Sequence, residues 1–147
     1  MKKTLRALLG ALILPVVLLC VSALQGCEKS NEMGKLRGQW QLLTIEYPDG
    51  EVVTVDNPRR YIVFDQWIVQ LTSTDDDTMF TGYWTGTVTG TDPDYVFDFP
   101  YDKDESNLER IAPWGIDDWH VAVHVSTLDS KRLVMKAGDN TLTLRRF

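Results

Sequence analysis

The sequence predicts an all-β fold, a single antiparallel up-and-down β-barrel of about 8–10 strands over residues 36–147. Turn-forming residues interrupt the chain roughly every eight to twelve residues from Leu36 onward, which is the spacing of an all-β domain. Apolar and polar residues alternate between these turns, and helical periodicity is nearly absent after Cys27. Short sequential hairpins favour a closed barrel over a sandwich, because closure removes exposed strand edges.

The turns place the strands in order. Pro48-Asp49-Gly50 closes the first hairpin, since Pro fixes its own φ and Gly accepts a positive φ. Asn57-Pro58 ends the second strand. A tight turn at Asp65-Gln66 either separates two strands or bends one. The predicted strands are residues 36–47, 51–55, 61–64, 67–72, 78–89, 95–99, 119–125, 133–137 and 141–147.

The segment 78–89 has the clearest strand pattern. Phe80, Trp84 and Val88 share one face with Gly82 and Gly86, while mainly Thr and Tyr occupy the other face. Glycines at a two-residue period let a strongly curved sheet bend past bulky neighbours. We therefore expect the aromatic face of this strand to point into the barrel.

The N-terminus predicts export and lipidation. Lys2, Lys3 and Arg6 precede an apolar stretch that ends in Leu24-Gln25-Gly26-Cys27, the pattern of a bacterial signal peptide with a lipobox. Residues 1–26 are then a cleaved signal peptide, 27–35 the lipidated Cys27 with a tether, and 36–147 the barrel. The protein is expected at the outer membrane, on the cell surface or facing the periplasm. The alternative is a transmembrane helix that is retained.

The charge of the mature chain excludes some partners. The whole chain has a formal net charge of −6, and residues 1–26 hold three basic and no acidic residues, so the mature chain carries −9. This acidity argues against nucleic acid and against electrostatic docking onto anionic lipid. Membrane attachment is expected through the acyl chains on Cys27, which leaves no thiol for a disulfide, a nucleophile or a metal.

The two ends of the predicted barrel resemble a known family. Gly38-Gln39-Trp40 is similar to the Gly-x-Trp that opens lipocalins and fatty-acid-binding proteins. Residues 128–135 and 141–147 resemble the last hairpin of small lipocalin-like lipoproteins of the Bacteroides type. The resemblance implies that Trp40 closes one end of the barrel beneath Arg145 or Arg146. Guanidinium over indole contributes about 0.5–2 kcal/mol.

No catalytic or metal site is expected, and the protein is predicted not to be an enzyme. His120 and His124 lie four residues apart in a strand, roughly 13 Å from each other, so one ion cannot bridge them. Asp118 and His120 share a face and could form a structural carboxylate–imidazole pair. Residues 75–77 lack the spacing of a calcium loop and are expected to form a solvated turn. No cofactor is predicted.

The resemblance favours a binding function over catalysis. In such a barrel we expect a small hydrophobic or amphipathic ligand, bound without covalent chemistry in a pocket with a few polar anchors. The predicted lining residues are Phe80, Trp84, Tyr95, Phe97 and Trp119. The same side chains could instead fill a solid barrel.

The alternative function is a protein-interaction module without a small ligand, such as an envelope inhibitor or an accessory subunit of an outer-membrane complex. Residues 108–116 have no clear period and could form a short helix or an irregular flap. The alternative places its contact at an exposed Pro113-Trp114-Gly115 loop, because a Trp on a loop is a frequent interface anchor.

Overall fold

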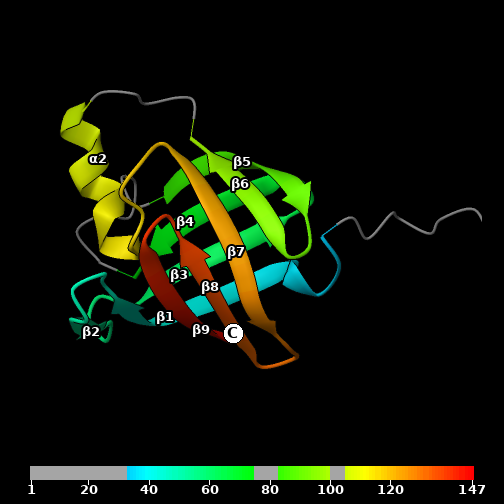
Figure 1. Cartoon of the computed structure of the whole chain (residues 1–147), viewed down its shortest axis with the longest axis horizontal. Helices are drawn as coiled ribbons and strands as arrows, with labels where there is room; N and C mark the ends of the chain where they lie inside the picture. The colour runs from blue at the N-terminus through cyan, green and yellow to red at the C-terminus, as the bar shows by residue number, and fades with distance from the viewer. Residues whose placement is uncertain (1–32, 75–82, 100–104) are drawn as a thin grey trace, which may run out of the picture. The chain divides into compact units, whose positions relative to one another are not determined.

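The computed structural model describes residues 33–74, 83–99 and 105–147 (Figure 1). The predicted signal peptide, Cys27 and most of the tether therefore lie outside the described residues, as do Phe80, Gly82 and the acidic residues 75–77 that were predicted to form a turn. Among the described residues, no helix has the length and apolar character needed to cross a bilayer.

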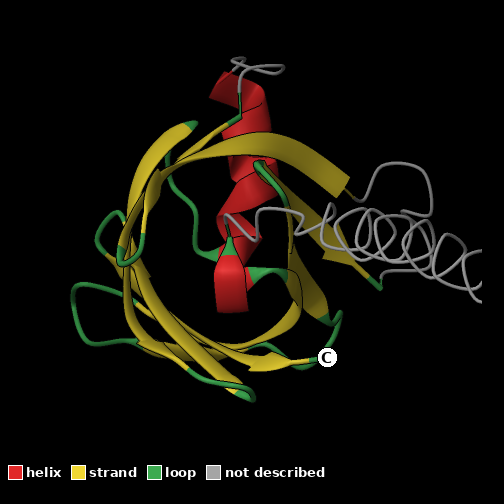
Figure 2. Ribbon diagram, turned by 90° about the vertical axis from the view of Figure 1, so that its right-hand side faces the viewer, coloured by secondary structure: helices red, strands yellow, loops and turns green. Residues whose placement is uncertain are grey.

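The described strands form one antiparallel sheet that closes on itself. They are β1 (Gly38–Glu46), β2 (Val52–Thr54), β3 (Arg60–Asp65), β4 (Ile68–Ser73), β5 (Tyr83–Thr91), β6 (Asp94–Asp98), β7 (His120–Leu128), β8 (Arg132–Ala137) and β9 (Asn140–Arg146). The sheet order is β2-β1-β3-β4-β5-β6-β7-β8-β9, and β1 also pairs with β9. Apart from the short β2, the strands form a closed eight-stranded barrel, which confirms the predicted fold class (Figure 2).

Strand alternation fills the barrel with apolar side chains. In β7 the residues alternate strictly between exposed and buried from His120 to Val125. In β6, Tyr95 and Phe97 are buried while Asp94 is exposed. The largest fully buried side chains are Trp40, Phe64, Phe97, Phe99, Leu36, Leu42, Ile45, Ile62, Leu71, Ile111, Ile116 and Leu133.

The antiparallel order gives the barrel two distinct ends. We call the end where β1 begins the closed end; it holds the 3-10 helix η1 (Gly34–Leu36) and the turns β3–β4, β5–β6 and β7–β8. The opposite end, which we call the mouth, holds the β8–β9 turn and the connection from β6 to β7. Figure 1 shows these two sets of connections at opposite ends of the strands.

The connection from β6 to β7 packs against the barrel, so the predicted exposed Trp114 loop is wrong. It forms α2 (Glu105–Ile111) and a second 3-10 helix, η3 (Ala112–Trp114). Trp114 is only 5% exposed. Its indole N–H donates to the Tyr61 carbonyl at 3.1 Å and the Thr72 carbonyl at 3.2 Å, at the mouth ends of β3 and β4. Together with Ile111 and Ile116, it belongs to the barrel core.

Gly115 makes this packing possible. It takes a left-handed conformation with φ +75°, and a Cβ there would collide with the Leu142 side chain and approach Ile45 Cγ2 at 3.1 Å. The Gly115 carbonyl also accepts a 3.0 Å hydrogen bond from the buried Asn140 amide. A side chain at this position is therefore opposed by both the backbone conformation and the core.

Gly115→Ala is expected to destabilise the barrel by about 2–4 kcal/mol, which urea denaturation would measure. The matched control is Gly50→Ala. Gly50 also has a positive φ of +87°, but a Cβ there would meet no atom within 4 Å. The control should cost only the conformational term, about 1 kcal/mol. Equal destabilisation by the two changes would contradict the close packing of the connection on the core.

Candidate functional site

Two of the predicted ligand-lining residues, Tyr95 and Phe97, belong to the core. Both project inward from β6 and are 5% and 0% exposed. The Phe97 ring packs on Phe64 with centroids 5.6 Å apart. Burial, followed by the nearby Asp92 carboxylate, raises the pKa of the Tyr95 hydroxyl, which is therefore neutral near pH 7. These aromatics stabilise the barrel and lie away from solvent.

Two other predicted residues, Trp84 and Trp119, meet at the mouth. Trp84 lies at the start of β5, and Trp119 directly precedes β7. Their rings are tilted by 55° with centroids 6.1 Å apart, and both side chains are partly buried against the core. The Trp119 carbonyl accepts a 2.9 Å hydrogen bond from the Phe99 N–H, which fixes the backbone beside the pair. We call Trp84 and Trp119 the mouth pair.

The mouth pair presents apolar surface that the core does not fully cover. Leu108 of α2 is likewise a partly buried apolar residue that packs against the core. Aromatic pairs of this tilted kind gain roughly 0.5–1.5 kcal/mol beyond area burial, so the pair is a stable surface rather than two loose side chains. Among the predicted ligand residues that the structure describes, these two alone are partly accessible from solvent.

The closed end contains the residues that the family resemblance implied. Trp40 is fully buried, and its indole N–H donates to the Leu36 carbonyl at 2.8 Å. The Arg146 guanidinium lies 5.0 Å from the Trp40 ring centroid. Arg145 faces outward instead and donates twice to the Gln41 side chain, at 3.0 and 2.8 Å. Arg146 is therefore the partner of Trp40.

A shallow hollow of about 310 Å³ lies on the outside of the barrel wall, over β6, β7 and β8. Asp94 and His124 stand opposite each other in the register of β6 and β7, and His124 Nδ1 lies 2.7 Å from Asp94 Oδ1. The hollow is lined by Asp94, Tyr95, Val96, Ala122, Val123, His124, Lys136 and Gly138. The pattern of alternate residues in each strand did not predict this hollow, because it depends on the register between strands.

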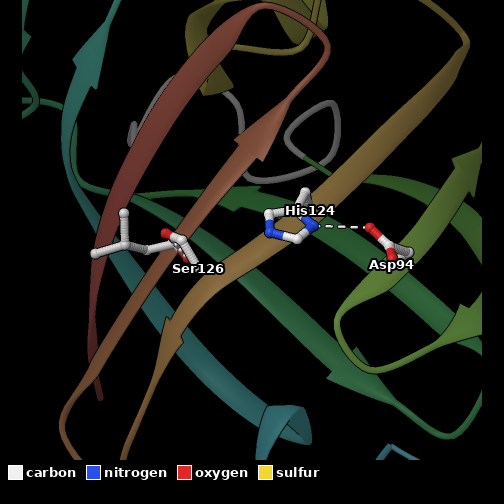
Figure 3. Close-up of polar contacts among 4 residues, drawn as sticks. Asp94, His124 and Ser126 are labelled. Atoms are coloured by element: carbon white, nitrogen blue, oxygen red, sulfur yellow. Dashed lines mark hydrogen bonds and ion pairs between the residues drawn. The ribbon is translucent and has the colours of Figure 1, made fainter.

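The residues beside the hollow do not form a nucleophilic triad. Ser126 follows His124 on the same strand (Figure 3), but its hydroxyl donates to the Val134 carbonyl on β8 at 3.2 Å. A serine nucleophile needs a hydrogen bond to its base, within about 2.6–3.2 Å. Ser126 is instead bound to the β-ladder, and the Asp94–His124 pair is a surface contact between strands.

The second histidine has a different partner from the predicted one. Asp118 accepts a hydrogen bond from the His120 backbone N–H at 3.3 Å. The His120 imidazole instead faces Asp98 across the β6–β7 register, with Nδ1 3.9 Å from Asp98 Oδ2. No group of three or more His, Cys, Asp or Glu side chains within the described ranges is arranged to hold a metal ion.

The chain matches a known domain family in sequence and two solved structures in fold. Residues 19–147 match the family model of a lipocalin-like domain. A lipocalin-like protein from Bacteroides uniformis has a similar crystal structure, with TM-score 0.63 and 20% identity over 78% of this chain and 100% of that chain. An uncharacterized protein from Bacteroides eggerthii is similar at TM-score 0.58 and 19% identity, over 76% and 98% of the two chains. No curated protein matches the sequence.

Proposed function

From the chain's membership of the lipocalin-like domain family, we propose that it is a lipid-anchored protein of the cell envelope whose barrel binds a small hydrophobic or amphipathic molecule at its mouth, without catalysis. The anchor is the acylated Cys27. The binding surface is the mouth pair. Lipocalin-like barrels are generally binding folds rather than catalytic ones.

The partly exposed aromatic pair at the mouth is the observation that supports this proposal. Ligand sites are mostly apolar surfaces with a few polar groups, and they recur in the mouths of β-barrels. Trp84 and Trp119 offer two indole faces at such a position, and their rings already hold a fixed tilt. A flat apolar ligand would cover the exposed surface of these two rings. Binding would be favoured because this apolar area would no longer contact water.

Tryptophan fluorescence is the direct test, because the proposed site contains two of the five Trp residues. The mature protein is titrated separately with oleate, cholesterol and haemin. We expect a saturable change in emission with at least one of these probes. Trp119→Ala should weaken that binding by about tenfold or more, since loss of an aromatic contact of roughly 1.4 kcal/mol corresponds to tenfold in affinity.

Trp67→Phe is the matched control, since Trp67 is an exposed Trp in the β3–β4 turn at the closed end. This change should lower total emission and leave the affinity unchanged. Unaltered affinity in Trp119→Ala would place the site elsewhere. If none of the three probes changes the emission, the ligand proposal fails and the protein-interaction alternative gains. That alternative now has the hollow over β6, β7 and β8 as its surface, because Trp114 is buried.

A further inference from the structure

The anchor would join the barrel at its closed end. The described chain enters through Met33 and Leu36, which are buried in the core next to Trp40. Cys27 precedes Met33 by six residues. Six residues span at most about 20 Å in any conformation, because each extends the chain by about 3.3–3.6 Å. Acyl chains on Cys27 would therefore hold the closed end near the bilayer surface.

The same end carries exposed apolar side chains. Trp67 is 43% exposed and Ile68 is 47% exposed, both at the β3–β4 turn. Gln66 in this turn has a positive φ of 54°, and the Trp67 carbonyl accepts a 2.8 Å hydrogen bond from Val88 N–H, which ties the turn to β5. Trp is enriched where one face meets lipid and the other meets water, because its ring is apolar and its N–H is polar.

The charges of the barrel are segregated in the same direction. Among the residues that the structure describes, six basic ones lie at the closed end against four acidic ones: Lys35, Arg37, Lys131, Arg132, Arg145 and Arg146 against Asp65, Asp92, Asp94 and Asp129. At the mouth the balance of the described residues is reversed, with Arg59, Arg60, Arg110 and Lys136 against Glu46, Asp49, Glu51, Asp56, Asp98, Glu109, Asp117, Asp118 and Asp139. Over the described ranges, the closed end therefore has an excess of basic residues and the mouth an excess of acidic ones.

Much of this positive charge remains available. Arg37 pairs with Asp65 at 2.8 Å. Asp129 accepts hydrogen bonds from the Lys131 and Arg132 backbone N–H groups at 2.7 and 2.8 Å; these bonds, and to a smaller extent the charges of Arg132 and Lys131, lower the pKa of its carboxyl. Within the described parts of the chain, no carboxylate lies within 4.0 Å of the Lys131 or Arg132 side-chain nitrogens. Both residues are exposed.

We propose that the closed end is a bilayer-docking surface, which sets Trp67 and Ile68 into the interface of an anionic phospholipid membrane and turns the mouth away from it. Lys131 and Arg132 face the lipid phosphates, because the negative surface of an anionic bilayer attracts basic residues that lie close to it. The inference rests on the proposed anchor at Cys27. With the closed end held on the bilayer by the short tether, the mouth pair remains accessible to ligands.

The test uses the lipidated mature protein reconstituted into vesicles of phosphatidylcholine and phosphatidylglycerol. The phosphatidylcholine is brominated near the headgroup end of its acyl chains, so it quenches only Trp at the interface. Flotation first establishes attachment. We expect quenching of part of the Trp emission, and loss of that quenched component in Trp67→Phe. A Lys131→Glu/Arg132→Glu variant should lose the increase in quenching that phosphatidylglycerol produces.

Arg110→Glu is the matched charge control, because Arg110 is an exposed residue of α2 at the mouth. The Trp emission of this variant should be quenched to the same extent as that of the wild type. Failure to float would overturn the anchor and the docking surface together. Flotation with equal quenching in the wild type and Trp67→Phe would overturn the docking surface alone. Reduced quenching in Arg110→Glu as large as in the closed-end variant would also overturn it.

Discussion

Trp40→Ala is expected to destabilise the domain by about 3–5 kcal/mol, the usual cost of removing a fully buried aromatic side chain. Trp40 is 0% exposed, so the change leaves a cavity in the core. It also removes the donor to the Leu36 carbonyl and the ring beneath Arg146. Since small domains are stable by only about 5–15 kcal/mol, the variant should be close to unfolding at 37 °C.

Thermal unfolding followed by circular dichroism would measure this loss. Each kcal/mol shifts the midpoint by about 4 °C in a domain of this size, so a fall of roughly 12–20 °C is expected. Trp67→Ala removes the same side chain from an exposed site and should change stability by about 0.5 kcal/mol or less. Similar midpoints for the two variants would show that Trp40 does not hold the closed end together.

Arg146 takes part in the same closure through its guanidinium. It donates to the Lys35 carbonyl at 3.0 Å and to the Arg37 carbonyl at 2.8 Å. Gly38 has a φ of +132°, which other residues rarely adopt, and a Cβ at that position would lie 2.8 Å from Arg146 Nη2 and displace the guanidinium. The Gly of the Gly-x-Trp pattern therefore has a physical reason: it leaves room for the arginine that covers the Trp.

The strands and their faces could be predicted because side chains in a strand alternate with a period of two. In β6, Tyr95 and Phe97 are buried on one face, and Asp94, Val96 and Asp98 lie on the other. The same alternation also distinguishes Arg145 from Arg146. Leu142 and Leu144 point inward, so the next inward position in β9 is Arg146. The alternation in β9 is therefore sufficient to choose Arg146 over Arg145 as the inward residue.

Trp114 could not be placed from the sequence. Its segment has no period, and its burial depends on carbonyls of β3 and β4 that lie 53 and 42 residues away in the chain.

The charge asymmetry between the two ends of the barrel could not be predicted for a related reason. Lys131 and Arg132 are far in sequence from Lys35, and only the barrel topology brings their turns to one end. Net charge alone therefore argued against a lipid surface that one end of the barrel could use.

Cys27→Ser is expected to abolish lipid attachment and to release the domain from the membrane fraction. A serine hydroxyl cannot take the thioether-linked diacylglycerol that the lipobox directs to the cysteine. Attachment by two or more acyl chains is stable because each buried CH₂ contributes about 0.8 kcal/mol. Under the docking proposal, Trp67, Ile68 and the few basic side chains at the closed end would orient an anchored domain, but they would be too weak to replace the anchor.

Metabolic labelling with palmitate and fractionation of membranes would measure this effect. Cys20→Ser is the matched control, because Cys20 lies in the same apolar stretch but follows Leu19, which is too large for the small-residue position before a lipidated cysteine. The control should label and sediment with membranes as the wild type does. Palmitate that persists in Cys27→Ser, or label that disappears in Cys20→Ser, would show that Leu24–Cys27 does not act as a lipobox. The closed end would then have no anchor near it, and bilayer docking through Trp67 would lose its physical basis.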